Sequence, residues 1–528
     1  MNAREAVFQW MREAGMTTVF GNPGSTELPF LYAFPKQMRY VLALQEASVV
    51  AMADAYAQAS GCAALVNLHT APGLGNAVGQ LVTAYENRSP LIVTAGQQDT
   101  RQLRYDPLLS GDLVGIARPY VKEAFQAVCA DELPFLFERA WLTAMTPPQG
   151  PVFLAIPMDF WDQPATPVGH RDVVLTPHPA PEAVEAFAAA LNASAHPALV
   201  FGSGVDRSRA WQEAVALAER LGADVFSDAV GARNGFPRNH PQYKGSLAPA
   251  MAAVSQQLAS YDVVLAAGAP VFRYYPYLPG PVLPPKTQLL LLTDDPHAIA
   301  TAVGGRAVLG DIKAGLAVLG EAVSQRPSIR VAVEPPPAVS QPQPGAPFDP
   351  AFVAQRLAEA MPEGCVMVDE AISNSAVFAR YLRPHQPGSY YTAASGGLGF
   401  GVPAAIGIKL ADLTRPVVAV VGDGSLQYTV QALYTAAQQQ LPIVVLVLRN
   451  AEYNILKGFA AMLYQGQPGE IPGLDLPGID IVGLAKAYGA DAVFADSAAT
   501  LDAALSQAFQ ATKPTVITVD VTSGPLAL

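Results

Sequence analysis

The chain has 528 residues, a length that suggests about three domains. Only 14% of the residues are charged and 51% are hydrophobic, which predicts extensive buried surface, including surface between subunits. The net charge of −12, without a basic stripe, argues against a nucleic-acid partner. Three widely separated cysteines and seven scattered histidines argue against a disulfide framework or a zinc site, and predict a cytoplasmic protein.

Short apolar runs, each broken by glycine, proline or charge, predict no membrane span, because a span needs about 18 or more consecutive apolar residues. Residues 1–7 predict an amphipathic helix and not the core of a signal peptide.

Strand-like runs alternate with helical patterns along the whole chain, which predicts an α/β fold with parallel sheets flanked by helices. The expected strands of a first block are 17–20, 40–44, 64–68, 90–94 and 151–156. Those of a second block are 198–201, 262–266 and 288–292. Those of a third block are 365–368, 416–421, 442–448 and 514–519. Proline-rich segments at 163–181 and 326–350 are expected to link the blocks.

Two strand ends in the third block carry a pattern for anion and metal binding. Gly422-Asp423-Gly424-Ser425 follows one strand, and Arg449-Asn450 ends the next one along the chain. Glycines let a backbone approach phosphates, and a helix opening at Ser425 would favour an anion. Asp423 and Asn450 offer the oxygen ligands that Mg²⁺ prefers. Because open α/β sheets bind ligands at the carboxyl ends of their strands, the pattern predicts a metal-bridged diphosphate. Apolar residues at 430, 433, 434 and 437 extend the predicted helix.

Three further polar positions follow strands of the first block. They are Ser25 in Gly21-Asn-Pro-Gly-Ser25, Glu46 before a helix expected over 47–59, and His69 after the strand 64–68. Each has a structural explanation by itself: a Pro-Gly turn, an acid at a helix N-terminus and a histidine at a strand end. Together they lie at carboxyl ends of parallel strands and are expected to converge on one crevice.

The third-block pattern resembles the diphosphate motif of thiamine diphosphate (ThDP) enzymes, whose usual ending is Asn-Asn; here the first Asn is replaced by Arg449. Longer runs, spread over nearly the whole chain, resemble the benzoylformate decarboxylases within the ThDP-dependent 2-keto acid decarboxylases. These runs are 19–25, 42–47, 90–97, 268–274 and 396–400. The resemblance implies a pyrimidine-binding domain at 1–165, a middle Rossmann-like domain at 182–325 and a diphosphate-binding domain at 346–528.

The resemblance also implies the chemistry: ThDP and Mg²⁺ as cofactors, and non-oxidative decarboxylation of a 2-keto acid, benzoylformate first, to an aldehyde and CO₂. Glu46 would hydrogen-bond the pyrimidine ring and hold or share a proton, while Leu398 would wedge the cofactor into a bent shape. Ser25 would contact the substrate carboxylate, and His69 would transfer protons. The implied cofactor residues are Glu46, Ile372, Ser373, Gly396, Leu398, Asp423, Gly424, Ser425, Asn450 and Tyr453. The implied metal ligands are Asp423, Asn450 and the backbone carbonyl of Glu452.

The chain departs from that pattern around the substrate. Tyr275 stands where the benzoylformate decarboxylases have a second catalytic histidine, and a phenol is a slower proton shuttle at pH 7. Slower protonation would favour capture of a second aldehyde, although water or His69 could replace the missing histidine. Thr392 replaces an aromatic residue and Ile455 an alanine. The implied substrate pocket comprises Ser25, His69, Leu108, Leu109, Thr392, Ile455, Leu456 and Phe459.

Alternative functions remain at this point. The chain could decarboxylate a smaller or aliphatic 2-keto acid, or be a carboligase similar to acetolactate synthase or benzaldehyde lyase. A non-catalytic protein that binds ThDP, or a nucleotide at Gly202-Ser203-Gly204, is disfavoured because Glu46 and Asp423 are both retained. The family's active sites lie between subunits, so the resemblance implies a homo-oligomer, with a dimer of dimers expected.

Overall fold

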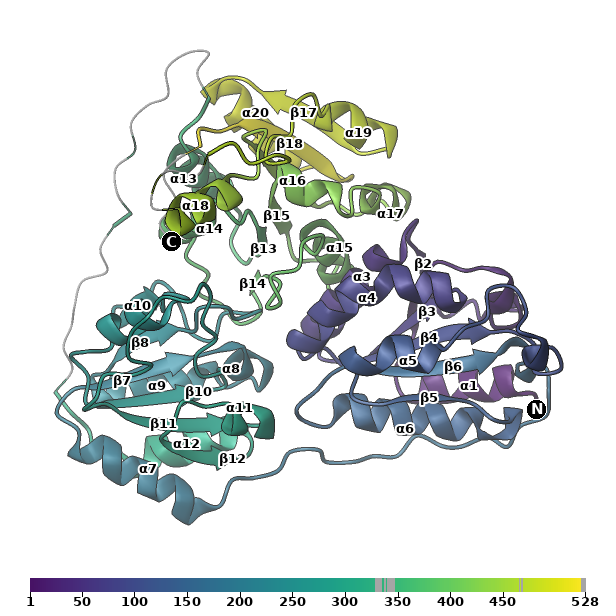
Figure 1. Cartoon of the computed structure of the whole chain (residues 1–528), viewed down its shortest axis with the longest axis horizontal. Helices are drawn as coiled ribbons and strands as arrows, with labels where there is room; N and C mark the ends of the chain where they lie inside the picture. The colour runs from purple at the N-terminus through teal and green to yellow at the C-terminus, as the bar shows by residue number, and fades with distance from the viewer. Residues whose placement is uncertain (328–334, 337–338, 340–346, 465, 467–468, 524–528) are drawn as a thin grey trace. The chain divides into compact units, whose positions relative to one another are not determined.

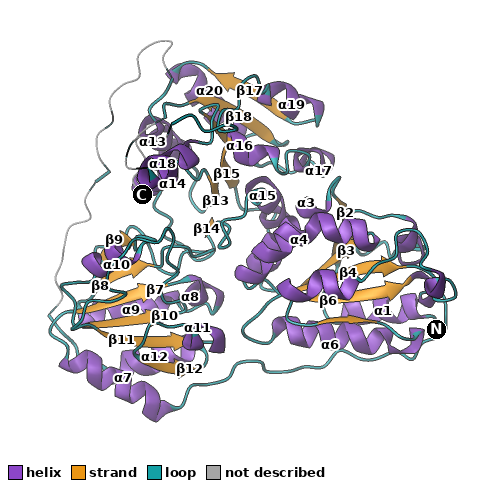
Figure 2. Ribbon diagram, in the orientation of Figure 1, coloured by secondary structure: helices purple, strands orange, loops and turns teal. Residues whose placement is uncertain are grey.

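The computed structural model describes residues 1–327, 335, 336, 339, 347–464, 466 and 469–523, so most of the linker predicted at 326–350 lies outside the described residues. The chain forms two compact units. Unit one comprises Met1–Val174, Val339–Phe378 and Ala393–Ala527, and unit two comprises Leu175–Ala338 and Ala379–Thr392. Parallel strands flanked by helices build both units, which confirms the predicted α/β class (Figures 1 and 2).

The first sheet of unit one is parallel, with the strand order β2-β1-β3-β4-β6-β5. Its strands are β1 (Thr18–Gly21), β2 (Arg39–Leu42), β3 (Ala64–Leu68), β4 (Leu91–Gln97), β5 (Ala124–Gln126) and β6 (Val152–Pro157). Its helices are α1 (Ala3–Glu13), α2 (Leu28–Leu31), α3 (Glu46–Ser60), α4 (Thr70–Glu86), α5 (Leu113–Ala117) and α6 (Leu133–Met145). The central strands are fully buried because helices cover the sheet. Sequence periodicity missed β5, whose three residues are too few to show a pattern.

The second sheet of unit one runs β13-β15-β16-β18-β17, and these strands are also parallel. They are β13 (Val366–Glu370), β15 (Val417–Gly422), β16 (Val444–Arg449), β17 (Asp491–Ala495) and β18 (Thr515–Asp520). The helices are α13 (Pro350–Ala360), α15 (Gly401–Ala411), α16 (Asp423–Gln427), α17 (Ala432–Gln438), α18 (Asn454–Leu463), α19 (Ile481–Ala487) and α20 (Ala498–Ala508). The helix predicted from Ser425 to Ala437 is therefore two short helices, because the chain turns between Tyr428 and Gln431.

Helices α3 and α15 pack against each other and join the two sheets of unit one. A Cβ atom on Gly407 would lie 2.1 Å from the carbonyl oxygen of Met52 and 2.9 Å from the amide of Tyr56. Only glycine permits this approach of two helix backbones. The hydroxyl of Thr435 also donates to the carbonyl of Leu42 at 2.8 Å. The first and third sequence blocks are thus held together within one unit.

Unit two contains a parallel sheet with the order β12-β11-β10-β7-β8-β9. Its strands are β7 (Pro197–Phe201), β8 (Asp224–Ser227), β9 (Tyr243–Ser246), β10 (Val263–Ala267), β11 (Gln288–Thr293) and β12 (Arg306–Leu309). Residues Tyr390–Tyr391 form the short strand β14. Its helices are α7 (Pro181–Ala193), α8 (Ser203–Arg207), α9 (Trp211–Leu221), α10 (Met251–Gln257), α11 (Pro296–Ala300) and α12 (Ile312–Ala322). The boundary between the units falls within α14 (Ser375–Tyr381).

The glycines at 202 and 204 serve close packing at the end of β7. A Cβ on Gly202 would lie 2.5 Å from the carbonyl oxygen of Gly268, and one on Gly204 would lie 2.6 Å from Cδ1 of Ile312. Their backbone faces other protein atoms, which gives these glycines a role that needs no nucleotide.

Among the described residues, no helix has both the length and the apolar character needed to cross a bilayer.

Candidate active site

Three of the predicted catalytic positions follow neighbouring strands of the first sheet. Strands β2, β1 and β3 lie side by side and run parallel, so Ser25, Glu46 and His69 follow strands that end at the same edge. Ser25 opens the 3₁₀ turn η1 (Ser25–Glu27) and is exposed. Glu46 opens α3, and His69 immediately precedes α4.

The carboxyl group of Glu46 is held by two amide side chains. Nδ2 of Asn22 donates to Oε1 at 3.0 Å, and Nδ2 of Asn76 donates to Oε2 at 3.1 Å. Glu46 is only 7% exposed. Because both oxygens are engaged, the carboxyl plane is fixed relative to β1 and α4.

His69 is oriented by Glu27, a buried acid. Nδ1 of His69 lies 2.8 Å from Oε2 of Glu27, whose other oxygen accepts from the hydroxyl of Thr26 at 2.7 Å and the amide of Gly96 at 2.9 Å. A carboxylate accepts, so Nδ1 carries the proton and Nε2 is left as an acceptor. This pairing gives His69 the tautomer that can take up a proton at Nε2.

Two glycines bring the His69 and Glu46 groups close together. A Cβ on Gly24 would lie 2.2 to 2.4 Å from ring atoms of His69. A Cβ on Gly73 would lie 3.2 Å from Oε1 of Glu46 and 3.4 Å from Cβ of His69. The two ionisable side chains therefore border one small region of the sheet edge.

Replacing Glu27 by glutamine is expected to lower kcat by about 10- to 100-fold, the size of effect seen when a partner that orients a functional histidine is removed. Glutamine keeps the shape but presents an amide that competes as a donor toward Nδ1, so the tautomer is no longer set. Steady-state kinetics would measure the change, with Glu123→Gln, an exposed partner of Arg139, as the control. Equal kcat values for Glu27→Gln and wild type would contradict this role.

The second sheet contributes a cavity of about 400 Å³ at the ends of β15, β16 and β18. Its lining residues are Pro347, Asp423, Arg449, Asn450, Ala451, Leu476, Gly478, Ile479, Asp520 and Val521. Asp423 and Asn450, predicted as metal ligands, therefore line the same space.

Asp423 is the most buried polar side chain in this cavity, at 3% exposure. Its Oδ1 accepts from the amide of Gly424 at 2.9 Å and its Oδ2 from the amide of Ala451 at 2.8 Å. Burial raises the pKa of Asp423, while those two amides and the charge of Arg449 act in the opposite direction. Burial disfavours the ionised form of a carboxyl group, so a cation bound beside Asp423 would strongly stabilise its carboxylate.

Asn450 is followed closely by Glu452, whose backbone and side chain make separate contacts. Oδ1 of Asn450 accepts from the amide of Glu452 at 3.2 Å. The Glu452 side chain pairs with Lys457, which also contacts Asp475 at 2.6 Å. The predicted role of Glu452 uses its backbone carbonyl, so this side-chain pairing leaves that role available.

Tyr453, another predicted cofactor residue, packs on Gly424. A Cβ on Gly424 would lie 2.7 Å from Cε1 of Tyr453. This contact explains why a glycine follows Asp423.

Arg449, the departure from the usual motif, pairs with Asp520 across β16 and β18. Its Nε and Nη2 donate to the two carboxylate oxygens at 2.5 and 2.9 Å. The guanidinium also lies 5.0 Å from the ring centroid of Phe494. Arg449 thus places a guanidinium at the edge of the cavity, where the carboxylate of Asp520 balances its charge.

The loop with the predicted cofactor residues Gly396 and Leu398 precedes α15. Gly396 is exposed and has a φ of +72°, and Leu398 is half-buried. Ile372, 42% exposed, and Ser373, half-buried, follow β13. Ile372 and Ser373 lie at the same sheet end as Asp423, since β13 and β15 are parallel neighbours. The amide of Gly399 donates to Glu370, the last residue of β13, which brings the loop with Gly396 and Leu398 to that end as well.

The apolar residues predicted for the substrate pocket differ in exposure, and their common pocket stays a prediction. Leu108 is 85% exposed and Leu456 is 46% exposed. Leu109 has a φ of +68°, and Ile455 and Phe459 are half-buried on α18. None of these five described residues lines the 400 Å³ cavity.

Tyr275 and Thr392 lie in unit two. Tyr275 is 68% exposed, and its amide donates to the carbonyl of Pro249 at 2.6 Å. The amide of Thr392 donates to the carbonyl of Ala232 at 2.9 Å. The structure thus places these two predicted residues in a different unit from Glu46 and His69.

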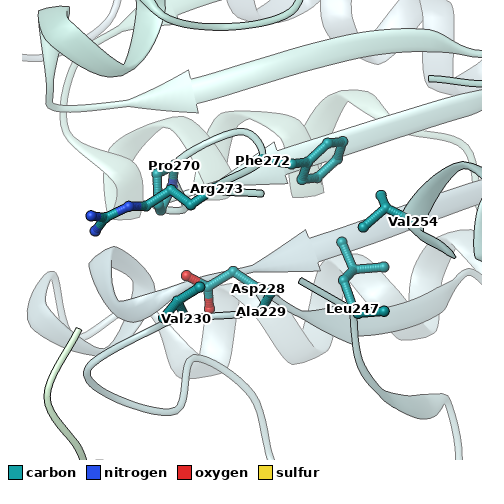
Figure 3. Close-up of a pocket in the computed structure, with 9 residues that line it drawn as sticks. Asp228, Ala229, Val230, Leu247, Val254, Pro270, Phe272 and Arg273 are labelled. Carbon is teal, nitrogen blue, oxygen red and sulfur yellow. The ribbon is translucent and has the colours of Figure 1, made fainter. Parts of the chain in front are cut away.

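A small cavity in unit two lies beside the segment that leads to Tyr275. Figure 3 shows Asp228 on one side of it and Pro270, Phe272 and Arg273 on the other. Its volume of about 10 Å³ is room for one water molecule. Burial raises the pKa of Asp228 to about 7. This cavity is too small for a nucleotide.

Sequence reasoning missed the residues that hydrogen-bond Glu46 and His69, which are Asn22, Glu27 and Asn76. Glu27 lies two positions after Ser25. It is a single acidic residue in a turn between apolar runs, and this was the one sequence feature that could have pointed to it. Packing of the folded chain decides which side chains form these hydrogen bonds, and no sequence motif marks the residues that provide them. Among the described residues, no group of three or more His, Cys, Asp or Glu could hold a metal ion.

Comparison with known proteins matches three family models along the chain. They describe the N-terminal TPP binding domain of thiamine pyrophosphate enzymes at residues 1–132, the central domain at 184–319 and the C-terminal TPP binding domain at 371–519. The benzoylformate decarboxylase of Pseudomonas aeruginosa is 40% identical over 523 residues, which cover 97% of this chain and 98% of that protein.

Solved structures agree with those matches. The benzoylformate decarboxylase of Polynucleobacter necessarius superposes with a TM-score of 0.96 at 40% identity, covering 99% of both chains. The thiamine diphosphate-dependent 4-hydroxybenzoylformate decarboxylase of Rhodococcus jostii RHA1 has a TM-score of 0.94 at 38% identity, covering 99% of this chain and 100% of that one.

Proposed function

This chain belongs to the thiamine pyrophosphate enzymes and, within them, to the benzoylformate decarboxylases, and from that premise we propose that it converts benzoylformate to benzaldehyde and CO₂. It is a thiamine diphosphate-dependent carboxy-lyase. The observation that supports the choice of reaction is the 40% identity to a benzoylformate decarboxylase over 97% of the chain, together with His69, whose Nδ1 lies 2.8 Å from Oε2 of Glu27.

The residues at the cavity fit a diphosphate and a divalent cation. A buried carboxyl and an amide oxygen face the same space. One carboxylate and one amide are too few ligands for Mg²⁺, which usually completes its shell with water and substrate or cofactor phosphates. We therefore assign Asp423, Asn450 and the carbonyl of Glu452 to Mg²⁺, with Gly424, Ser425 and Tyr453 around the diphosphate.

ThDP, when bound, supplies a sink for the electron pair that remains as CO₂ departs. The chain's own groups bind, orient and move protons. Glu46 holds a proton at a carboxyl oxygen and shares it with the pyrimidine ring. The hydroxyl of Ser25 donates to the substrate carboxylate, and Nε2 of His69 accepts and returns a proton at the reacting oxygen or carbon.

The substrate preference rests on an apolar surface whose residues differ from those implied by the resemblance. Thr392 is smaller than an aromatic residue, and Ile455 is larger than alanine. An apolar site separates related substrates by only about 1–3 kcal/mol per methylene. We therefore propose aromatic 2-keto acids as the substrate class, with aliphatic 2-keto acids as slower substrates.

Carboligation is the second candidate activity, and Tyr275 is the observation that favours it. A phenol replaces the second histidine of the benzoylformate decarboxylases, so protonation after CO₂ loss is slower and a second aldehyde has time to react. In this proposal aldehyde release remains the main outcome, since Nε2 of His69 can take up a proton and return it.

The active site is proposed to form between two chains of a homo-oligomer. Leu108, Leu456 and Tyr464 are large apolar side chains left 46% to 85% exposed, and contact with a second copy would cover them. A dimer of dimers is the proposed assembly.

The decisive experiment offers the purified protein a panel of 2-keto acids, benzoylformate included, with ThDP and Mg²⁺ added or withheld, and measures CO₂, aldehyde and acyloin. We expect benzaldehyde and CO₂ in equal amounts from benzoylformate, only with both cofactors present. CO₂ accompanied mainly by acyloin would replace decarboxylase by carboligase. No turnover of any acid by protein that binds ThDP would contradict both activities.

A further inference from the structure

The loop that carries Leu398 has little conformational preference of its own. Gly396 and Gly399, on either side of it, have φ angles of +72° and +94°, a region that glycine enters freely and other residues avoid. Leu398 itself is half-buried. Its position therefore depends on groups that hold the loop from outside.

One set of contacts comes from the sheet that carries Asp423. The carboxyl group of Glu370 accepts from the amides of Gly399, Phe400 and Gly401 at 2.6, 2.9 and 3.0 Å. The hydroxyl of Thr429 donates to the carbonyl of Gly399 at 3.0 Å. These contacts hold the part of the loop that follows Leu398.

The other set comes from one face of α4, in the first sheet's domain. Nε2 of Gln80 donates to the carbonyl of Leu398 at 2.9 Å, and Oγ1 of Thr83 lies 2.9 Å from Oγ of Ser395. The amide of Ala394 donates to Oδ1 of Asn87 at 3.0 Å. Spacings of three and four residues put Gln80, Thr83 and the C-cap residue Asn87 on one side of the helix, and all three are buried. Of these contacts, the one from Gln80 reaches Leu398 itself.

The same helix also reaches Glu46. Asn76, one turn before Gln80, donates to Oε2 of Glu46 at 3.1 Å. Beyond the far end of α4, Asn87 donates to the buried carboxyl of Asp54 at 2.8 Å, which fixes that end to α3. In Figure 1, α4 lies against α3, which in turn packs on α15. Helix α4 thus contacts both Glu46 and the loop that carries Leu398.

We propose that Gln80 is a positioning residue, whose hydrogen bond to the Leu398 carbonyl sets how far the Leu398 side chain projects toward bound ThDP. The inference rests on the proposed function, because it requires that the chain binds ThDP and that Leu398 keeps the bound cofactor bent, as the family resemblance implies. A misplacement of about 1 Å in a reacting group costs up to about 100-fold in rate, so a single hydrogen bond at this point matters.

The test uses Gln80→Met, which keeps the length of the side chain and removes the amide donor. Four quantities are measured on the holoenzyme: ThDP affinity by fluorescence quenching, hydrogen–deuterium exchange at C2 of bound ThDP without substrate, kcat with KM, and the melting temperature. Loss of one hydrogen bond is worth about 1 kcal/mol, so we expect exchange and kcat to fall about 5-fold or more, with KM and ThDP affinity changed less than about 3-fold.

Two further variants separate positioning from a general loss of structure. Thr83→Val removes a contact three residues from Leu398, so its exchange rate is expected to stay within about 2-fold of wild type, since contacts away from the reacting group act weakly. Leu398→Ala is expected to slow exchange at least as much as Gln80→Met. Adding Gln80→Met to Leu398→Ala should then slow exchange no further, because both changes act through one side chain.

The outcomes are distinguishable. Wild-type exchange in Gln80→Met, or exchange that falls only in step with ThDP affinity and melting temperature, would overturn the inference alone. Additive losses in the double variant would also overturn it. A wild-type protein that binds no ThDP would overturn the proposed function and this inference together.

Discussion

Asp423→Asn is expected to weaken ThDP binding in the presence of Mg²⁺ by more than about 100-fold, since even the loss of an outer partner of a metal ligand costs 10- to 100-fold. The substitution keeps the volume of a side chain that is 3% exposed, so no cavity results. It removes the negative charge, and it can turn an amide donor toward the backbone amide of Ala451, where the carboxylate now accepts. Titration of the apoenzyme with ThDP at fixed Mg²⁺, followed by fluorescence, measures the effect.

Asp520→Asn is the matched control for Asp423→Asn. Asp520 lines the same cavity, but its carboxylate pairs with Arg449 and the pair is about one-third exposed. Exposed pairs contribute about 0–1 kcal/mol, so this variant should bind ThDP within about 5-fold of wild type. Equal affinities in Asp423→Asn and wild type would remove Asp423 from the proposed metal site.

Glu46→Gln is expected to lower kcat by about 10²- to 10⁴-fold, the range that a positioned acid or base contributes. The shape of the side chain and at least one of its contacts with Asn22 and Asn76 can be kept, so the fold should be unchanged. What is lost is the group that shares a proton with the cofactor. We therefore expect ThDP affinity within about 3-fold of wild type, because an interaction used only in the reaction lowers kcat and not binding.

Asn76→Ala is the companion variant for Glu46→Gln. It removes one donor to the Glu46 carboxyl, which remains ionisable, so the loss in kcat should be no more than about 10-fold, as for a single hydrogen bond. Steady-state kinetics at saturating ThDP and Mg²⁺ gives both values. A Glu46→Gln enzyme as active as Asn76→Ala would show that Glu46 is not the proton-sharing acid.

The same two inactive proteins also test the proposed assembly. If each site takes Glu46 from one chain and Asp423 from another, a mixed dimer of Glu46→Gln and Asp423→Asn subunits has one intact site. Random mixing then restores about a quarter of wild-type activity, by the symmetry of a two-chain assembly. Activity no greater than that of the separate variants would indicate a site completed within one chain.

Residues that follow strands in short motifs were predictable from the sequence. Asp423 and Asn450 each follow a run of β-branched and aliphatic residues, and the structure gives these runs as neighbouring parallel strands β15 and β16. Glu46 and His69 were found in the same way. Local periodicity reveals where strands end, and parallel strands end at one edge, so such residues meet without any further information.

The tertiary structure alone decided which groups orient those residues. Glu27 is 42 positions from His69, and Gln80 is 318 positions from Leu398. Polar side chains so far apart in the sequence come into contact only after sheets and helices have packed, and no local sequence pattern predicts the contact. The turn that divides α16 from α17 also escaped prediction, because the apolar spacing continues across it.

The sequence by itself therefore determined the α/β class, the family and the chemical groups at the strand ends, since all three depend on local pattern and on motifs of fixed spacing. Only the tertiary structure decided that Glu27 orients His69, that Arg449 pairs with Asp520, and that α4 holds the Leu398 loop. The physical reason is that a hydrogen bond or ion pair depends on distances of about 3 Å between side chains, which packing of the whole domain sets.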